Sequence, residues 1–574
     1  MGLKLASSFA VLFLFGLIYA VVFIIGIWFL PNDLFGLLLM VAFTILIVLF
    51  QYGISPLIIR WIYRIDWITY EDFTFQFPHL ADAVNKVVED EGIRTPKMGI
   101  IHDLNPNAFT FGWTKNSARL VVTDGILHYL NKKEQKAVVA HELGHIVHSD
   151  FILMTVVFAI PLILLTIARW SYYAARFSGS SRRSRDSDSG NYIGLALIAI
   201  AAISYIAYYI GYLISLLISR IREYYADQHS AEITNNPNDL STALIKIAYG
   251  LLVSGSTEEM HEKRKSPVRA LRGLGIFEPN KSGLISTQTI IGLDGQISKK
   301  AVEAAAGWDL FNPWAKYFQL FSTHPLPAKR IQRLNKECEI YEVPVEYDLS
   351  GAKKIKEEQA GKSMLDEFLV DLTIKNLPWL IFFILLGLTI IQILGMVGLF
   401  SWQIPLFYSN FILFWALGFF AIGIGVIARA YFKYRSGFEF NNIVELVSNI
   451  KVSPIRTVPT IIEGRIVGRG IPGYYFSEDL FFQDSTGLMY IDYRYGLPFV
   501  DFFWAITKAK RLVGQNVRIK GWYRRGPNPY IQVDTIETES GRRFRNYAKH
   551  MAYIFSGLFF AIGVFLFYLW FTAL

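Results

Sequence analysis

The sequence predicts a membrane α-helical protein that also contains an α+β domain and a small all-β barrel. Hydrophobic residues make up 53% of the 574 residues and charged residues only 18%, and the mean hydropathy is +0.34. Several apolar runs exceed 18 residues, which is long enough for a helix to cross a bilayer. The remaining chain contains a helix with the motif HELGH and, towards the C-terminus, a series of short alternating segments typical of strands.

Seven apolar segments are candidate membrane spans. They are residues 7–30, 35–59, 151–169, 193–219, 378–400, 406–428 and 551–573. Only six residues precede the first segment, and no small-residue cleavage site separates it from the second, so we expect a retained helix and not a signal peptide. Cys338 is the only cysteine, which excludes an intrachain disulfide and a thiolate metal cluster.

The charges of the short connections predict that the soluble parts are cytoplasmic, in a multi-pass protein of the cell membrane. Connections 31–34 and 401–405 carry no Lys or Arg, whereas basic residues flank the opposite ends of the spans. These basic residues are Arg60, Arg64, Arg429, Lys433, Arg435, Arg542, Arg543, Arg545 and Lys549. The connection 170–192 disagrees because it holds four arginines. Either the helices 151–169 and 193–219 do not cross completely, or the charge rule is overridden there.

The motif His141-Glu142-Leu143-Gly144-His145 predicts a hydrolytic metal site. Histidines four residues apart share one helix face, so both can bind one Zn²⁺ while Glu142 acts as general base towards the attacking water. Asn131, with Glu134 three residues later, resembles a capping box and predicts a helix that begins just before the motif. A chance match on a polar surface helix is the alternative.

Glu223 is the predicted third metal ligand. The span 151–169 follows the motif directly, and the span 193–219 must return to the same side, so a helical hairpin brings Glu223 to the depth of the two histidines. Asp227 lies four residues later on the same helix face, where it can orient a ligand imidazole. An ordinary juxtamembrane cluster of charged residues is the alternative for this pair.

Other ligand sets fit less well. His148 is only three residues beyond His145 and diverges from a metal held by the first two histidines. Phe151 occupies the position of the third histidine of the metzincin motif. We therefore expect a gluzincin-type zincin domain with a His/His/Glu site and one Zn²⁺ per chain.

The order of these motifs resembles the HtpX-type membrane metallopeptidases, which are relatives of the type I CAAX prenyl proteases. The resemblance covers roughly residues 1–340 and rests on HELGH followed by Asp150, a hydrophobic helical pair, the EYYAD segment at 223–227, and Ser-Thr-His-Pro at 322–325. It implies Zn²⁺ at His141, His145 and Glu223, with Glu142 as base and Asp227 as a buttress. Because HELGH follows the second span and not a late one, the pattern favours the HtpX-like branch.

The resemblance also assigns roles to two other segments. Asn107-Ala108-Phe109 is similar to the family's Asn-Ala-Phe stretch beside the site, and the alternation through Gly112 predicts a strand whose edge could bind extended substrate. A plain core strand is the alternative. His324 looks like the family's His-Pro element, which implies a catalytic donor to the oxyanion. A helix-entry turn is the alternative for His324.

Residues 433–548 predict a five-stranded, OB-like barrel. Alternation indicates strands at 460–467, 480–482, 488–493, 516–523 and 530–536, with a helix at 497–512 between the third and fourth. Its basic and aromatic residues would suit a nucleic-acid groove, namely Arg465, Arg469, Tyr493, Lys520, Trp522, Tyr523, Arg524 and Arg525. Cations beside an anionic leaflet and aromatics in a barrel core are expected anyway, so we expect no nucleic acid.

The expected organisation has six parts. They are two N-terminal spans (1–60), a metallopeptidase domain with its membrane hairpin 151–219 (61–340), a linker (341–377), a membrane hairpin (378–428), a cytosolic OB-like domain (433–548) and a final span (551–574). The implied activity is a zinc endopeptidase that cleaves misfolded, damaged or membrane-proximal proteins on the cytosolic side. Its partners would be polypeptides and the lipid bilayer, and oligomerisation is compatible with the sequence. The alternative is a multispanning scaffold or receptor with a non-catalytic HExxH and a ligand-binding barrel.

Overall fold

The computed structural model describes residues 34–63, 65–103, 106–178, 189–256, 299–360, 364–396, 410–469, 480–494, 504, 509–526 and 529–572. The chain forms two compact units. The first contains residues 1–287, 317–348 and 472–475, and the second contains residues 288–316, 349–471 and 476–574. The predicted span at 7–30 lies outside the described residues.

The first unit is built on a four-stranded mixed sheet with the order β1-β2-β4-β3. The strands are β1 (Asp66–Ile68), β2 (Lys97–Ile101), β3 (Ala108–Phe111) and β4 (Arg119–Thr123). β2 and β4 run parallel, whereas β1 with β2 and β3 with β4 are antiparallel. β3 lies at one edge of the sheet. The strand predicted from the alternation at 107–112 is therefore confirmed.

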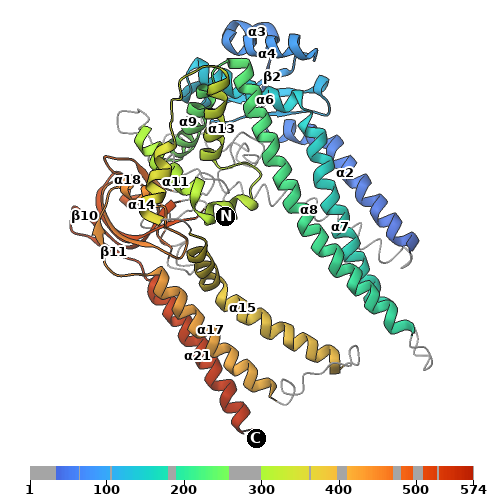
Figure 1. The fold of residues 1–574 in the computed structure, drawn as a ribbon, viewed down its shortest axis with the longest axis vertical. Coiled ribbons are helices and arrows are strands. Elements are labelled where there is room, and N and C mark those ends of the chain that lie inside the picture. The colour runs from blue at the N-terminus through green and yellow to red at the C-terminus, as the bar shows by residue number, and fades with distance from the viewer. Residues whose placement is uncertain are drawn as a thin grey trace. The chain divides into compact units, whose positions relative to one another are not determined.

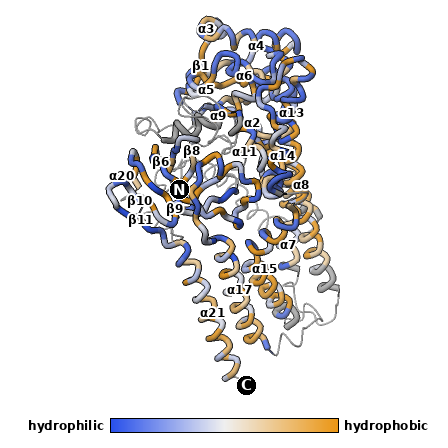
Figure 2. The backbone as a smooth tube through the Cα atoms, turned by 60° about the vertical axis from the view of Figure 1, so that its left-hand side comes forward, coloured by the Kyte–Doolittle hydropathy of each residue, from blue (hydrophilic) through white to orange (hydrophobic). Residues whose placement is uncertain are grey.

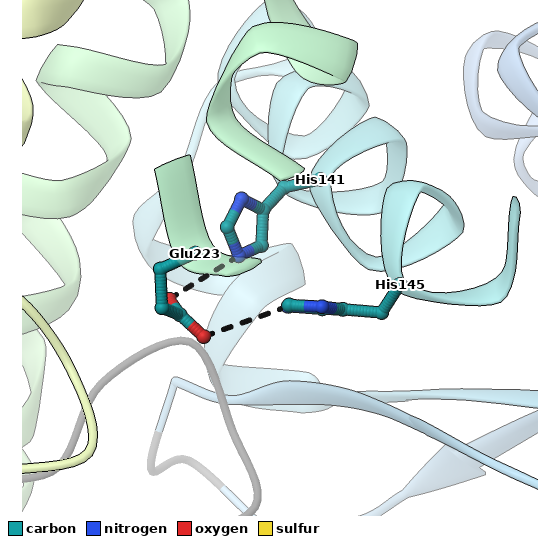
Figure 3. A group of neighbouring side chains, drawn as sticks. All are labelled: His141, His145 and Glu223. Carbon is teal, nitrogen blue, oxygen red and sulfur yellow. Dashed lines mark ion pairs between the residues drawn. The ribbon is translucent and has the colours of Figure 1, made fainter. Parts of the chain in front are cut away.

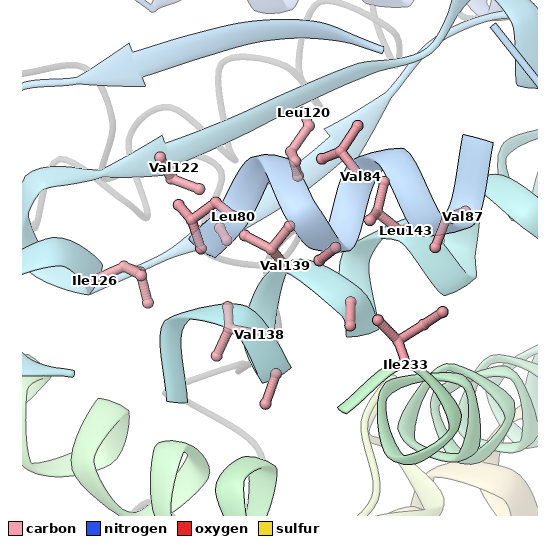
Figure 4. Packing of buried hydrophobic residues seen from close by; sticks show 14 of the residues in the cluster. Leu80, Val84, Val87, Leu120, Val122, Ile126, Val138, Val139, Leu143 and Ile233 are labelled. Atoms are coloured by element: carbon pink, nitrogen blue, oxygen red, sulfur yellow. The ribbon is translucent and has the colours of Figure 1, made fainter. Parts of the chain in front are cut away.

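Two helices, α4 (Pro78–Glu91) and α6 (Lys132–Val147), pack against one face of this sheet (Figure 4). The core between them consists of aliphatic side chains, among them Leu80, Val84, Val87, Leu120, Val122, Val139 and Leu143. Phe109 and Phe111 point to the opposite face, where they pack with Tyr63. Successive residues of β3 thus contribute to different faces, as the pleat of a strand requires.

The capping box predicted at the start of α6 is confirmed. The Asn131 side chain accepts hydrogen bonds from the backbone N–H groups of Lys133 and Glu134, and the Glu134 carboxylate accepts from the Asn131 N–H. Lys246 of α9 (Pro237–Ser256) also donates to Glu134, at 2.7 Å. These contacts fix the start of a helix whose later residues, including His141 and Glu142, are buried.

A tight turn joins α6 to the helical hairpin formed by α7 (Asp150–Ser178) and α8 (Ser189–Thr234). Ser149 adopts the left-handed conformation with φ of 56°, which lets α7 begin immediately after α6 in a new direction. α7 and α8 run side by side (Figure 1), and the Ser215 hydroxyl donates to the Val157 carbonyl at 2.9 Å. α8 is 46 residues long and continues beyond α7 towards α6.

The close contact between α6 and α8 depends on Gly144. A Cβ at this position would lie 3.1 Å from the Cα of Ala226 and 3.1 Å from the Cβ of His229. Two helical turns earlier on α6, the Ala137 carbonyl accepts a hydrogen bond from the buried Ser230 hydroxyl of α8 at 2.7 Å. The glycine of the HELGH motif is therefore a packing residue that lets two helix backbones approach each other.

Shorter elements complete the first unit. They are α2 (Leu34–Ile62), α3 (Tyr70–Gln76), a 3₁₀ turn (Lys115–Ser117), α5 (Asp124–Tyr129) and α13 (Pro327–Ile340). α13 packs against α8 and α9, so it reaches the same region as the end of α8.

Six helices in the described part of the chain are long and apolar enough to span a membrane. The spanning segments are Leu38–Trp61, Asp150–Arg176, Ala196–Thr234, Leu365–Gln392, Phe411–Lys433 and Ala548–Thr572. Figure 2 shows the apolar stretches along these helices. They correspond to the predicted spans from the second to the seventh, and their exposed surfaces are rich in large aliphatic and aromatic side chains.

The second unit contains a closed five-stranded barrel. Its strands are β6 (Val458–Arg469), β7 (Leu480–Gln483), β8 (Leu488–Asp492), β9 (Asn516–Arg525) and β10 (Pro529–Thr538). The pairing runs β6-β7-β8-β10-β9 and returns to β6, with β8 and β10 parallel. β5 (Glu439–Phe440) and β11 (Arg543–Arg545) extend this sheet. All five predicted strands are present, and of the helix predicted at 497–512 the structure describes only Trp504 and residues 509–512, which include α20 (Lys510–Leu512).

The second unit also contains helices. They are α11 (Lys299–Phe311), α12 (Pro313–Leu320, which extends into the first unit), α14 (Ser350–Ala360), α15 (Leu365–Met396), α17 (Phe411–Lys433), α18 (Ile443–Ser448) and α21 (Ala548–Thr572). Arg525 of β9 ties two of them together. Its guanidinium donates to the Val447 carbonyl at 3.0 Å, to the Ala305 carbonyl at 3.0 Å and to Asp309 at 3.2 Å.

The aromatic residues that could have formed a nucleic-acid groove belong to the interior. Tyr493, Trp522 and Tyr523 are at most 3% exposed, and Arg524 and Arg525 are each 1% exposed. Base stacking requires an accessible aromatic face, so these side chains serve the barrel core and its helical cover.

The Gly144 contact yields a stability prediction. Gly144→Val should lower the free energy of unfolding by about 1–3 kcal/mol, because the new methyl groups meet the backbone of Ala226 and cannot be accommodated by a rotamer change. The measurement is the thermal midpoint of the purified full chain in detergent. Gly53→Val is the matched control, since Gly53 lies in α2 with no atom within 4 Å of its Cβ position. Equal midpoints for the two variants would contradict the close-contact role.

Candidate metal centre

Three potential metal ligands converge at the junction of α6 and α8 (Figure 3). His141 Nε2 lies 3.7 Å from Glu223 Oε2, and His145 Nε2 lies 3.6 Å from Glu223 Oε1. One donor atom from each of the three residues falls within 4.8 Å of the other two. The structure thus brings together the residues that the sequence predicted as ligands, from helices that are about 80 positions apart in the chain.

A carboxylate contacts the Nδ1 atom of each imidazole. His141 Nδ1 lies 3.0 Å from Asp227 Oδ1, and His145 Nδ1 lies 2.6 Å from Asp150 Oδ2. Arg222 donates to the other oxygen of Asp150 at 2.6 Å. A carboxylate acceptor at Nδ1 favours the tautomer that leaves Nε2 unprotonated. Both Nε2 atoms are therefore oriented as ligands towards Glu223.

The donor set fits Zn²⁺. His141 Nε2 and Glu223 Oε2 are buried and have no hydrogen-bond partner. Buried polar atoms almost always have a partner, and two that face each other across 3.7 Å have the chemistry of a pair of metal ligands. Two imidazole nitrogens and one carboxylate leave a fourth tetrahedral position for water or substrate. Three protein ligands with one open position is the ligand count of catalytic zinc sites, whereas structural sites have four.

Glu142 lies beside this set but is not one of the three converging ligands. Its side chain is 2% exposed, and the Thr110 hydroxyl of β3 donates to its Oε2 at 3.2 Å. Burial raises the pKa of Glu142 to about 8, although the charge of His145 acts in the opposite direction. A carboxylate with a pKa near neutrality is a suitable general base, because it both accepts and returns a proton readily.

The charges around His145 oppose its role as a neutral ligand. Burial disfavours the imidazolium, but the hydrogen bond to Asp150 and the charges of Glu223 and Glu142 outweigh it and raise the pKa of His145 to about 9. Zinc binds the neutral imidazole, so a zinc ion at this position would displace the proton from His145. The same carboxylates that attract a proton also attract a divalent cation.

The sequence comparisons agree with this geometry. Residues 75–338 match the family described as Peptidase family M48. A protease HtpX homolog of Methanothermobacter thermautotrophicus is 40% identical over 250 residues, which cover 43% of this chain and 87% of that protein. The chain belongs to peptidase family M48. Protease HtpX homologs of Thermococcus sibiricus and Pyrococcus furiosus are 30% and 31% identical over 59% and 58% of this chain, and over 97% and 96% of their own lengths. The crystal structure of S. mikatae Ste24p aligns at 15% identity with a TM-score of 0.34, over 58% of this chain and 65% of that one.

His324 reaches this M48 site from a loop before α13. Its Nε2 lies 3.4 Å from Glu223 Oε1, and the residue is 6% exposed. Arg220 of α8 holds the loop by donating to the carbonyls of Gln319 at 2.8 Å and Ser322 at 2.7 Å. The Ser322 hydroxyl in turn donates to the His324 carbonyl at 2.9 Å.

The M48 segment Asn107-Ala108-Phe109 contributes backbone and not side-chain surface. Ala108 is fully buried and Phe109 is 1% exposed, on opposite faces of the sheet. The backbone of Asn107 pairs with Thr123, whose hydroxyl accepts from the Asn107 N–H at 2.9 Å. Any contact of this segment with substrate must therefore be made by the main chain at the edge of β3.

Arg330 is a member of the site that the sequence analysis missed. It is 1% exposed, its Nε donates to Asp227 Oδ2 at 2.9 Å, and its Nη2 donates to Asp227 Oδ1. Its Nη1 also lies 3.4 Å from Glu223 Oε2. Arg330 therefore orients both the third ligand and the acceptor behind His141. The available signal was a basic residue in the first turn of the helix after His324-Pro325.

Arg330 yields the second prediction. Arg330→Gln should lower zinc content and destabilise the protein by about 3–5 kcal/mol, because Asp227 would remain as a buried charge without its guanidinium partner. Arg330→Lys should recover little of this, since an ammonium cannot replace the bidentate fork. Zinc per chain and the thermal midpoint are the measurements.

Arg333→Gln is the matched control for this prediction. Arg333 lies on the same helix but is exposed, with its guanidinium over the ring of Tyr224 at 4.9 Å. The Arg333→Gln variant should retain its zinc. If Arg330→Gln retains zinc and stability as well as Arg333→Gln does, Arg330 has no positioning role.

Proposed function

We propose that the protein is a zinc-dependent endopeptidase whose ligands are His141, His145 and Glu223. The observation that carries this proposal is the pair of buried atoms His141 Nε2 and Glu223 Oε2, neither of which forms a hydrogen bond, next to a buried carboxylate with a raised pKa. A scaffold with a non-catalytic HExxH has no need for these costly buried groups. Membership of peptidase family M48 supports the same activity.

In the proposed mechanism, Glu142 is the general base. It takes a proton from the water that attacks the scissile carbonyl and returns it to the leaving amine. Thr110 holds the carboxylate by its hydrogen bond to Oε2. Bound zinc supplies a Lewis acid that polarises the carbonyl and lowers the pKa of water. Asp227, Asp150 and Arg330 keep the ligands aligned, and His324 donates to the oxyanion that forms on the carbonyl.

The edge of β3 is the proposed binding place for the substrate main chain. β3 has β4 on one side and forms an edge of the sheet on the other. An extended peptide can add to such an edge as another strand. Thr110, the third residue of β3, donates a hydrogen bond to Glu142. This strand therefore lies beside the proposed general base, and a paired peptide would present its carbonyls to the site.

The proposed substrates are membrane and membrane-proximal polypeptides, including misfolded and damaged ones. His145 is followed by only five residues before the apolar part of α7 begins at Phe151. The ligand set is therefore within a few residues of the start of a candidate membrane span. We place the catalytic part on the cytoplasmic side, because the basic residues flank that side of the spans.

The barrel of the second unit is proposed to be of the OB type, with strand order 1-2-3-5-4-1 and a helical segment between strands three and four. Its two flanking helices, α17 and α21, tether it to the membrane on both sides. A barrel held in this way is suited to controlling access of large substrates to a catalytic site near the membrane surface.

The third prediction tests the catalytic role of Glu142. Glu142→Gln should lower peptidase turnover at least about 10²-fold with zinc retained, because the amide keeps the shape of the side chain but cannot accept the proton. The measurements are cleavage of a labelled peptide and zinc per purified chain. Glu223→Ala should instead lose zinc, whereas Glu232→Ala, nine residues later on α8 and exposed, should not. Full activity in Glu142→Gln, or wild-type protein without a chelator-sensitive zinc, would refute the proposal.

The fourth prediction concerns His324. His324→Ala should reduce turnover by about 10²- to 10³-fold while KM and zinc content change little, because an oxyanion donor acts mainly in the transition state. The experiment separates kcat from KM on one peptide substrate. A loss of zinc in His324→Ala would assign the side chain to support of Glu223, and unchanged kcat would remove it from the mechanism.

A further inference from the structure

A cavity of about 400 Å³ lies within the second unit, among the helices α15, α17 and α21. Its walls are formed by apolar side chains of all three helices, including Phe382, Val426 and Phe559. At one end the lining changes, because Arg429 and Lys433 of α17 and the neighbouring Tyr434 also border the cavity. This volume is in the range of ligand sites, and it combines a hydrocarbon-like interior with a cationic end.

The cationic end is a cluster of charges that lacks matching carboxylates. Arg429 and Lys433 are one helical turn apart on the same face of α17. Arg524 of β9 lies next to them, with its guanidinium over the ring of Tyr434 at 5.3 Å and its Nη2 3.4 Å from the Lys433 carbonyl. Among the residues that the structure describes, none of these three cations forms an ion pair.

Arg524 is the buried member of this cluster. It is 1% exposed, and its Nε has no hydrogen-bond partner. The carboxylate of Asp492 acts on Lys433 electrostatically, but it is already engaged by Arg494 at 3.1 Å. Four basic side chains, those of Arg429, Lys433, Arg524 and Arg494, thus stand against one carboxylate; Arg524 is buried, Arg429 and Lys433 are half-buried, and Arg494 is exposed. A phosphate group would supply the negative charge that these basic side chains have little of nearby.

We propose that this cavity binds an anionic phospholipid, with its phosphate on Arg429 and Lys433 beside Arg524 and an acyl chain between α15, α17 and α21. Lys and Arg donors form short, charge-assisted hydrogen bonds to phosphate oxygens. The three helices are candidate membrane spans, so the bilayer itself supplies the hydrocarbon that the cavity accepts. Arg429 and Lys433 lie in the last turns of the α17 span, where lipid headgroups are found. The site is independent of the metal centre and of the peptidase function.

The test uses the full-length protein in detergent and native mass spectrometry. The probes are dioleoylphosphatidylglycerol, which is anionic, and dioleoylphosphatidylcholine, which has the same chains and no net charge. We expect one phosphatidylglycerol retained per chain and little phosphatidylcholine. The double variant R429Q/K433Q should bind phosphatidylglycerol about 10- to 30-fold more weakly, as expected for the loss of two interfacial cations. Equal retention of the two lipids, or unchanged binding in R429Q/K433Q, would overturn the proposal.

A matched control removes the same number of charges elsewhere. Arg435 and Arg545 are exposed cations of the same unit that do not line the cavity, so R435Q/R545Q should retain phosphatidylglycerol. If binding falls equally in both double variants, the effect is general surface attraction and the site is refuted.

A third variant examines the acyl-chain part. Ala552 of α21 lines the cavity, and Ala552→Phe should fill it and weaken lipid retention with every cation in place. If R429Q/K433Q does not fold, Ala552→Phe still tests whether the cavity binds the lipid. Glycerol 3-phosphate carries the headgroup without chains and should not displace the lipid at the same concentration. Full displacement by glycerol 3-phosphate, or normal lipid retention in Ala552→Phe, would mean that the chains do not occupy the cavity.

Discussion

The close contact between α6 and α8 is the constraint on which the rest of the catalytic region depends. His141, Glu142 and His145 are fixed by one helix, but Glu223 and Asp227 come from another, and ligand atoms must approach within a few ångströms. The absence of a side chain at Gly144 lets the helix backbones meet at Ala226, and the hydrogen bond between Ser230 and Ala137 fixes their relative register. The sheet and α4 then support α6 from its other side. The candidate ligand set is thus brought together by helix packing.

The same region concentrates charge in a buried environment. Asp150, Glu223 and Asp227 are nearly inaccessible, and each is paired with a histidine or an arginine. Burying these groups costs free energy unless each charge has a partner. Arg330 offsets two of the carboxylates at once, and a divalent cation would offset those that face the two imidazoles. Stability and function therefore share one network, in which removing a single member exposes the others to an unfavourable environment.

Several parts of this arrangement were predictable because their signals are local. The capping box at Asn131, the shared face of His141 and His145, and the alternation of the five barrel strands all lie within a few residues of sequence. Glu223 could be placed as well, because a helical hairpin must return to its starting side. The role of Arg330 could not be predicted, because its partner Asp227 lies about a hundred positions earlier and the chain contains many other basic residues. Likewise, nothing in the residues of α11 shows that Arg525 ties it to the barrel, or that β8 pairs in parallel with β10. Those features are set by tertiary contacts between distant segments.

The length of α8 connects the candidate metal site to a membrane-spanning stretch in one continuous helix. This helix is continuous over 46 residues, or about 69 Å at 1.5 Å per residue, and it carries both an apolar stretch and Glu223. A helix whose apolar stretch does not match the surrounding hydrocarbon adjusts by tilting. Because α8 has no break between these two parts, a small change in tilt would move the Glu223 carboxylate relative to the two imidazoles on α6. The thickness of the surrounding bilayer would then be felt at the candidate metal site, through a helix held against α6 at the Gly144 contact.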